Sequence, residues 1–264
     1  MRSVTALVTA ILALAFAGAA HADDPKAWTV SIGAEGAAVP AYDGATRYVF
    51  RPFPLVDVRQ AGTPARFHSP RESFGFGILD TGSFRMGPVG RLRYERKESS
   101  DANLRGLGDV DWALELGAFA EYWVLPWLRA YGELRQGIGG HTGLVSDILV
   151  DAVYRATPAL TFSAGPRLAV QSEKAVSPYF DVTAAQSATS GLPVYSTSGG
   201  VTGWGVGGQV HYEWSPQWAT YTYVEYQRLV GAVANSPLVS LRGTPDQFAG
   251  GIGVTYSFNV PALW

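Results

Sequence analysis

The sequence predicts an all-β fold in the form of a closed antiparallel transmembrane β-barrel. Three observations support this prediction. Apolar and polar residues alternate with a period of two along most of the chain, which is typical of strands with two different faces. The 264 residues include 31 Gly, 13 Tyr, 12 Phe and 8 Trp, and 16% of them are charged, compared with roughly 25% in soluble domains. No stretch after the N-terminal segment approaches the roughly 20 apolar residues that a membrane-spanning helix needs.

The N-terminal residues have the pattern of a secretory signal peptide. Arg2 supplies a positive charge, residues 4–17 are apolar, and Ala20-His-Ala22 is a small-x-small cleavage site. We therefore expect cleavage after residue 22, so that the signal peptide is 1–22 and residues 23–264 form one domain. The chain contains no cysteine. An exported protein of this size must then be stable without disulfides, and a closed hydrogen-bonded barrel would explain that stability.

The alternation is clearest in the middle of the chain. In residues 111–122, Leu114 and Leu116 fall on one face. Glu115 and Glu121 fall on the opposite face. We expect the apolar face to contact lipid and the polar face to line an enclosed interior. The same scheme predicts further strands at residues 28–34, 48–58, 85–95, 127–138, 144–155, 160–171, 209–214, 221–227 and 247–258.

The expected connections between strands have two lengths. Bacterial outer-membrane barrels have short periplasmic turns and long extracellular loops, so we expect the long connections to face outward. The short connections fall at 80–83, 124–126, 156–158 and 215–217, and the long ones at 97–110, 173–202 and 230–246.

The number of strands follows from parity. About eleven strands are clear, and single-chain bacterial barrels have an even number. The missing strand is expected in Ala65–Leu79, where His68-Ser-Pro-Arg71 would be a tight turn between two short strands. The sequence therefore predicts about 12 strands. Ten is the alternative, if the N-terminal region pairs poorly.

Several segments carry recognisable motifs: PAYDG at 40–44, LRGLGDVD at 104–111, GGHTG at 139–143, QSATSGLPVY at 186–195 and NSPLV at 235–239. In order and spacing these motifs resemble the MipA/OmpV family of outer-membrane proteins, also called MltA-interacting proteins. The resemblance extends from Pro40 to Phe258. The motif residues that we single out are Gly106, Leu107, Gly108, Asp109, Ser190, Gly191, Leu192, Pro193, Ser236 and Pro237.

The resemblance implies a multi-pass protein of the cell outer membrane, in contact with outer-membrane lipid after signal-peptide cleavage. It also implies a noncatalytic scaffold that links a peptidoglycan-cleaving lytic transglycosylase to a peptidoglycan-synthesising murein synthase. The expected periplasmic turns are short, which leaves little surface for a protein interface of the usual size. A small-solute channel and a surface adhesin therefore stay open as alternatives.

The last expected strand contains a candidate assembly signal, formed by Gly253, Tyr256 and Phe258. The pattern resembles the terminal signal by which the barrel-assembly machinery recognises its clients. Any lipid-facing strand alternates aromatic residues in this way, however. Residues 259–264 follow the pattern, so Trp264 is an alternative terminal aromatic residue.

Charged residues of both signs fall on the faces expected to line the interior. Opposite charges on neighbouring strands can pair there, which removes the cost of an unpaired charge in a confined space. We expect an internal network of ion pairs. A selective pore and a catalytic use of paired carboxylates are the alternatives. The expected network consists of Arg91, Arg93, Glu95, Glu115, Arg129, Glu133, Arg135, Asp147, Asp151, Arg155, Arg167, Glu213 and Glu225.

The sequence offers little material for catalysis or for a metal site. After the signal peptide the histidines are His68, His141 and His211, and no Gly-x-Ser-x-Gly motif occurs. His141 has Asp147 nearby in sequence, but an activated nucleophile is missing. The histidines do not share a metal-ligand spacing. We therefore expect no enzyme, no cofactor and no metal.

Two further ligand classes are disfavoured. The formal net charge of −2, without a run of Lys or Arg, speaks against nucleic acid. The segment 203–208 matches the dinucleotide fingerprint Gly-x-Gly-x-x-Gly in letters. That motif requires a turn from a strand into a helix, and here the alternation continues as a strand.

The long segment 173–202 is rich in Ser, Thr, Ala and Gly but also contains Tyr179, Phe180 and Leu192. A disordered segment would carry fewer large apolar residues. We expect this segment to fold inward or over the barrel mouth, with Ser190–Pro193 as a turn. A mobile surface loop is the alternative.

Overall fold

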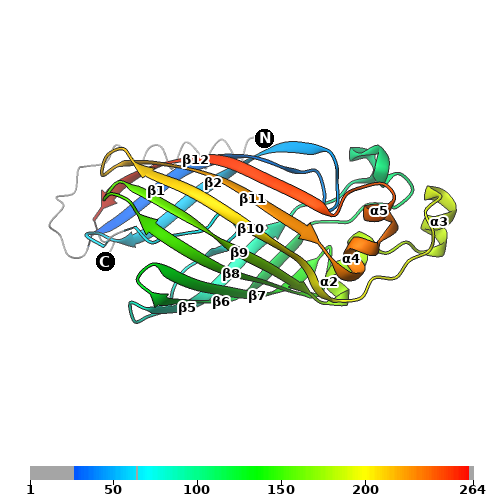
Figure 1. The fold of residues 1–264 in the computed structure, drawn as a ribbon, viewed down its shortest axis with the longest axis horizontal. Coiled ribbons are helices and arrows are strands. Elements are labelled where there is room, and N and C mark those ends of the chain that lie inside the picture. Colours follow the sequence, from blue (N-terminus) through cyan, green and yellow to red (C-terminus); the bar gives the residue numbers. More distant parts are fainter. Residues whose placement is uncertain (1–26, 64, 262–264) are drawn as a thin grey trace.

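The computed structural model describes residues 27–63 and 65–261. The expected signal peptide and Trp264 lie outside these residues. The described residues form a 12-stranded sheet that curls about its long axis (Figure 1). The strands are β1 (Trp28–Pro40), β2 (Tyr48–Gln60), β3 (Phe74–Gly75), β4 (Leu79–Asp80), β5 (Phe84–Arg93), β6 (Ala113–Leu125), β7 (Leu128–Gly139), β8 (Leu144–Arg155), β9 (Leu160–Gln171), β10 (Gly200–Glu213), β11 (Trp218–Leu229) and β12 (Asp246–Val260).

Short helices lie in the connections. None of the helices in the described part of the chain is long and apolar enough to cross a membrane. The helices are η1 (Glu98–Ser100), η2 (Ala102–Leu104), α2 (Glu173–Phe180), α3 (Ala184–Ser190), α4 (Gly231–Asn235) and α5 (Pro237–Ser240).

All strand pairs are antiparallel, and the all-β prediction is confirmed. The sheet order is β2-β1-β12-β11-β10-β9-β8-β7-β6-β5-β3, with β4 also pairing with β5. The pairing of Trp28 with Val260 brings the two ends of the described chain together. No hydrogen-bonded pairing joins β2 to β3 or β4 within residues 27–63 and 65–261. Closure of the barrel therefore stays a prediction.

The region expected to supply two short wall strands folds differently. The wall strands β3 and β4 begin only at Phe74. Residues 69–73 lie in the interior instead, and residues 65, 66 and 68 before them are exposed. The expected turn is present, because the amide of Glu72 donates to the carbonyl of Ser69 at 3.0 Å. The segment does not form a wall strand because of its charges. Arg66 and Glu72 would point to one face of such a strand and Arg71 to the other, so either orientation would place charge in hydrocarbon.

The two faces of the sheet differ as the alternation predicts. On β6 the outward Leu114 and Leu116 are about half exposed, whereas the inward Glu115 is buried. On β7 the outward Leu134 is exposed, and its neighbour Arg135 is buried. The outer surface is therefore apolar and the inner surface is charged, the reverse of a soluble protein.

The two ends of the barrel also differ. One end, at the left of Figure 1, has the short connections 81–83, 126–127, 156–159 and 214–217. We call it the short-turn end. The helices α2 to α5 gather at the other end (Figure 1). That end has the connections 41–47, 94–112, 140–143, 172–199 and 230–245.

The apolar outer face predicts a position-dependent response to charge. Leu134→Arg, at the middle of β7, should destabilise the barrel in lipid vesicles by about 2 to 4 kcal/mol, because it places a charge in hydrocarbon. Leu241→Arg is the matched control, since Leu241 is 65% exposed beyond the sheet and Leu134 is 53% exposed within it. Urea titration of both reconstituted variants measures the difference. Equal stabilities would contradict the assignment of the outer face.

Candidate functional site: a charged interior beneath a packed loop cap

Arg135 organises the first group of interior charges. Its Nε donates to Glu115 at 2.8 Å, and its Nη2 donates to Asp147 at 2.8 Å. Its Nη1 donates to Glu133 on the same strand. Arg91 of β5 lies 3.4 Å from both Glu133 and Asp147. One buried guanidinium thus links β6, β7 and β8, with each of its three nitrogens donating to a carboxylate.

Arg129 organises a second group nearer the short-turn end. Its guanidinium lies 2.9 Å from Glu121, 3.4 Å from Asp151 and 2.5 Å from Glu72. Arg167 of β9 pairs with the same Asp151 at 2.6 Å. Positive and negative side chains therefore alternate around the inner face of the sheet, so that each of these buried charges lies beside an opposite charge.

Residues 65–73 complete both groups from within the interior. Arg71 lies 3.1 Å from Asp147 of β8 and also pairs with Glu225 of β11. The amide and hydroxyl of Ser73 donate to Glu133 at 3.2 and 2.9 Å. Arg167 donates to the hydroxyl of Ser69 at 3.2 Å. This segment occupies the space between strands that are not neighbours in the sheet.

Nine of the expected network residues meet in these two groups. They are Arg91, Glu115, Arg129, Glu133, Arg135, Asp147, Asp151, Arg167 and Glu225.

The other four expected residues lie elsewhere. Arg93 pairs with Asp43 at 2.7 Å near the helical end, and Glu95 pairs with Lys97 at 3.0 Å beyond the end of β5. Arg155 and Glu213 are exposed at the short-turn end. The expectation that these four belong to one network is not met. Arg93, Arg155 and Glu213 are the last residues of their strands and Glu95 lies beyond β5, so all four lie at the ends of the wall, away from the two central groups.

Sequence reasoning missed several interior residues. Arg71, Glu72, Ser69 and Ser73 come from a segment without regular alternation, so no period assigned them to a face. The available signal was that charged residues occur at both odd and even positions of the segment, which disfavours a strand with one face in lipid. Glu121 was on the expected inward face and could have been included.

The wall formed by β10, β11, β12 and β1 is mostly uncharged. Its principal acid is Glu35, which accepts hydrogen bonds from Tyr221 and, at 3.0 Å, from Tyr223. The hydroxyls of Ser31 and Ser257 lie 2.7 Å apart. The ion pairs are therefore distributed unevenly around the interior, and most of them lie on the side formed by β5 to β9.

His141 has a structural partner in this interior. Its Nε2 lies 3.0 Å from Glu115, and the amide of Gly143 donates to its Nδ1 at 3.3 Å. The partner of His141 is thus Glu115. Asp147, which lies near His141 in the sequence, pairs with arginines instead. Within the described residues no group of three His, Asp or Glu is arranged to hold a metal ion.

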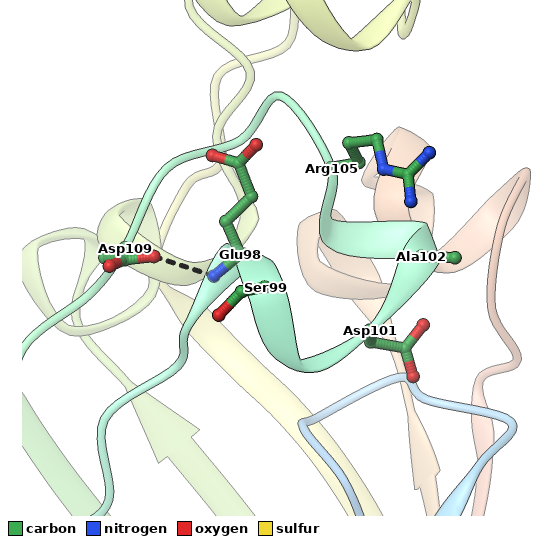
Figure 2. Close-up of a pocket in the computed structure, with 6 residues that line it drawn as sticks. All are labelled: Glu98, Ser99, Asp101, Ala102, Arg105 and Asp109. Carbon is green, nitrogen blue, oxygen red and sulfur yellow. Dashed lines mark hydrogen bonds between the residues drawn. The ribbon is translucent and has the colours of Figure 1, made fainter.

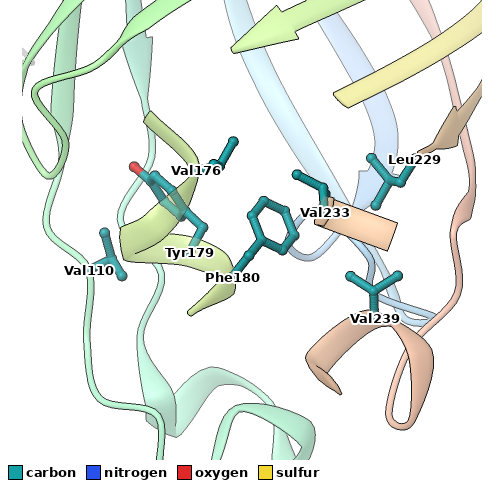
Figure 3. Close-up of a cluster of buried hydrophobic side chains, with 7 residues drawn as sticks. All are labelled: Val110, Val176, Tyr179, Phe180, Leu229, Val233 and Val239. Atoms are coloured by element: carbon teal, nitrogen blue, oxygen red, sulfur yellow. The ribbon is translucent and has the colours of Figure 1, made fainter. Parts of the chain in front are cut away.

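The helical end is covered by a layer of packed loops, which we call the loop cap (residues 41–47, 94–112, 172–199 and 230–245). Figure 3 shows its first apolar cluster, in which α2, α4, α5 and neighbouring strand ends meet. The cluster consists of Val110, Val176, Tyr179, Phe180, Leu229, Val233 and Val239, all buried. Segment 173–202 therefore folds over the mouth as predicted, and it does so through apolar burial.

A second apolar cluster lies within the same cap. It contains Leu104, Leu107, Val182, Leu192 and Leu238, with Tyr42 and Tyr195 packed against it. Leu107 and Leu192 are motif residues from two different loops. The motifs identified in the sequence therefore meet in space, although they are far apart along the chain.

Two motif glycines allow this contact. Gly106 has a φ of +85°, and a Cβ there would lie 2.6 Å from the amide nitrogen of Ser190. Gly191 ends α3 in the left-handed conformation with a φ of 74°, as is common at helix C-termini. Any larger residue at Gly106 would push the two loops apart.

The surface pocket in Figure 2 is lined by acidic side chains that are already engaged. Glu98 accepts from the amides of Gly106 and Gly108 at 2.7 and 3.0 Å. Its own amide donates to Asp109 at 2.7 Å. Asp101 accepts from Arg47 at 2.9 Å. These acids hold loop 94–112 in shape, so the pocket has a structural explanation.

The remaining motif residues also lie in the cap. The Ser236 hydroxyl is fully buried and donates to the carbonyl of Phe180 at 2.6 Å. Pro237 begins α5, and Pro193 follows the left-handed Gly191. At the other end, Tyr256 and Phe258 of the candidate assembly signal stack on β12 with ring centroids 6.1 Å apart.

The role of Glu98 gives a test of the cap. Glu98→Gln replaces one acceptor oxygen by an amide nitrogen that faces a backbone N–H, which should cost about 1 to 2 kcal/mol. Native-state trypsin cleavage at Arg105 should therefore accelerate by about tenfold. The neighbouring Ser99→Ala is the control and should cleave at the wild-type rate. Equal rates for all three proteins would show that Glu98 does not hold the loop.

Asp101 predicts a pH dependence of the cap. Burial alone would raise the pKa of Asp101, but hydrogen bonds from Arg47 and from the amide of Asn103 outweigh it and lower the pKa. The contribution of Asp101 to stability is then present above its pKa in the unfolded chain, about 3.9. It is lost as the pH falls through the lower pKa of the folded protein. Pepsin cleavage of the cap should accelerate below about pH 4. Asp101→Asn should weaken this acceleration, and an unchanged profile would contradict the assignment.

Among solved structures the chain is similar to an outer membrane channel from Pseudomonas putida F1, with 10% identity, a TM-score of 0.43, and coverage of 88% of this chain and 95% of that chain. It is also similar to the NanC porin, with 8% identity, a TM-score of 0.40, and coverage of 86% and 98%. No curated protein matches the chain. The family model described as MltA-interacting protein MipA matches residues 32–258, and the chain therefore belongs to the MipA family.

Proposed function

We propose that the protein is a noncatalytic β-barrel of the outer membrane that serves as a scaffold for cell-wall enzymes, linking a lytic transglycosylase to a murein synthase. The observation that carries the proposal is the filled interior. Arg71 and Glu72 of residues 65–73 pair with opposite walls, and the loop cap covers the helical end. The interior thus serves stability, which leaves the outer surfaces for function. The family description supports a transglycosylase as partner.

The orientation follows from the two ends. Short turns face the periplasm in bacterial barrels, so the short-turn end is the side on which periplasmic enzymes would bind. The outer face between the two ends is apolar, with Leu134, Ile148 and Val206 each about half exposed. In this orientation the loop cap faces outward.

The binding surface has to be assembled from several turns. A stable protein interface buries about 800 Å² on each partner, and one short turn is too small for that. The turns 81–83, 156–159 and 214–217 lie on one rim, together with the exposed residues 65 and 66. We propose this rim as the contact surface.

The alternatives fare differently. A permanently open solute channel is disfavoured by the segment that occupies the interior. A surface adhesin would use the loop cap, where Val194 and Leu241 are 64% and 65% exposed. These two residues are the specific observation that keeps the adhesin proposal in view.

A binding experiment tests the scaffold proposal. Immobilised full-length barrel in mild detergent should retain a purified lytic transglycosylase. The rim variant Ser83→Arg/Gln217→Arg should retain roughly tenfold less, because bulky charges disrupt a packed interface. The cap variant Leu241→Arg is the control and should bind normally. Absence of retention by the folded wild type, or equal retention by the two variants, would refute the rim as a docking surface.

A further inference from the structure

The segment 65–73 is held in the interior by polar contacts. Its most buried side chains are Ser69 and Ser73, at 1% and 4% exposure. Ala65, Arg66 and His68 are exposed, and Phe67 meets Trp123 edge-on with ring centroids 6.4 Å apart. A permanent core element would bury large apolar side chains. This segment is attached to the wall mainly by ion pairs and hydrogen bonds.

The wall does not need the segment to satisfy most of its own charges. Without Arg71, Asp147 keeps Arg135 at 2.8 Å and Arg91 at 3.4 Å. Without Ser73, Glu133 keeps the hydroxyl of Tyr131 at 2.9 Å.

The second group behaves in the same way. Without Glu72, Arg129 keeps Glu121 at 2.9 Å and Asp151 at 3.4 Å. Without Ser69, Arg167 keeps Asp151 at 2.6 Å. Among these wall charges, Glu225 is the one that would lose its ion pair, which is with Arg71. The cost of burying charge would be avoided for Arg71 and Glu72 themselves.

The chain is long enough for the segment to move. Thirteen residues join Gln60 at the short-turn end to Phe74 in the wall, and they can reach about 43 Å when extended. The wall segment from Phe74 to Asp80, which contains β3 and β4, covers only about 20 Å between Phe74 and the short-turn end. Gly62, with a φ of +80° and open space around it, provides a turn at the start of the connection.

We propose that residues 65–73 are a displaceable plug, and that the barrel interior alternates between a plugged state and a water-filled state open to small polar solutes at the short-turn end. In the uncovered wall Asp147 and Asp151 still pair with arginines, so the interior would carry charges of both signs and admit small solutes of either charge. This proposal goes beyond the scaffold function: it concerns the interior, whereas the scaffold concerns the rim, and the two share residues 65 and 66.

The absence of cysteine allows a direct experiment on the full chain in lipid vesicles. Ser69→Cys reports on the plug. Ser163→Cys, 8% exposed on β9, reports on the wall, four residues before Arg167, which binds Ser69. Ser236→Cys, fully buried in the loop cap, is the control. Small thiosulfonate reagents, one cationic and one anionic, measure the rate of thiol modification. We expect Ser69→Cys and Ser163→Cys to react with both reagents, and Ser236→Cys to stay unreactive.

The attachment of the plug is tested by a matched pair of double variants. Arg71→Ala/Glu72→Ala should raise the modification rates at positions 69 and 163 on the order of tenfold, because it removes the ion pairs that hold the plug. Arg228→Ala/Asp246→Ala removes the same types of charge from an exposed pair outside the interior and should leave both rates unchanged. Heat-modifiable mobility in gels verifies that each variant is folded.

Two outcomes would overturn the proposal. One is that cysteines at 69 and 163 are as unreactive as the cysteine at 236, with and without Arg71 and Glu72. The other is that the Arg71/Glu72 double variant accelerates all three positions equally, which would indicate general loosening. Neither outcome depends on whether a transglycosylase binds the rim.

Discussion

The structure depends on the pairing of buried arginines with carboxylates on the inner face of the sheet. Arg129 and Arg135 are 0% and 1% exposed. A guanidinium does not lose its proton in a protein, so it cannot avoid the cost of burial by becoming neutral. Opposed acids on neighbouring strands are therefore required, and they fix the register of those strands. A slip of one residue would turn Arg135 toward lipid and Leu134 inward.

The same constraint explains where residues 65–73 lie and why the sheet has two edges. In the wall, one face of this segment would place Arg71, or Arg66 and Glu72, in hydrocarbon. In the interior, Arg71 meets Asp147 and Glu72 meets Arg129. The chain thus returns from the short-turn end through the interior, and both β2 and β3 run toward that end. Direct pairing of these two strands would have to be parallel, unlike every other pair in the sheet.

The sequence predicts what depends on local alternation and fails where position depends on contacts across the fold. The strand expected at 144–155 is β8, and the strand expected at 160–171 is β9, residue for residue. Glu95 was assigned to the interior because the alternation continues in the sequence beyond the end of β5 at Arg93. Arg71 could not be placed, because its partners Asp147 and Glu225 are distant in sequence. The contact of Gly106 with Ser190 was hidden for the same reason, although both motifs were noticed.

The two ends of the barrel are closed by different forces. The loop cap is held by apolar burial around Phe180 and Leu238, and by the carboxylate of Glu98, which accepts hydrogen bonds from backbone amides. Residues 65–73 are held by ion pairs and polar contacts. Replacement of Arg71 and Glu72 would remove these ion pairs and leave the apolar burial of the loop cap in place, so the two ends can be weakened separately. The helical end is thus fixed by packing, whereas the contacts of residues 65–73 at the short-turn end depend on charge.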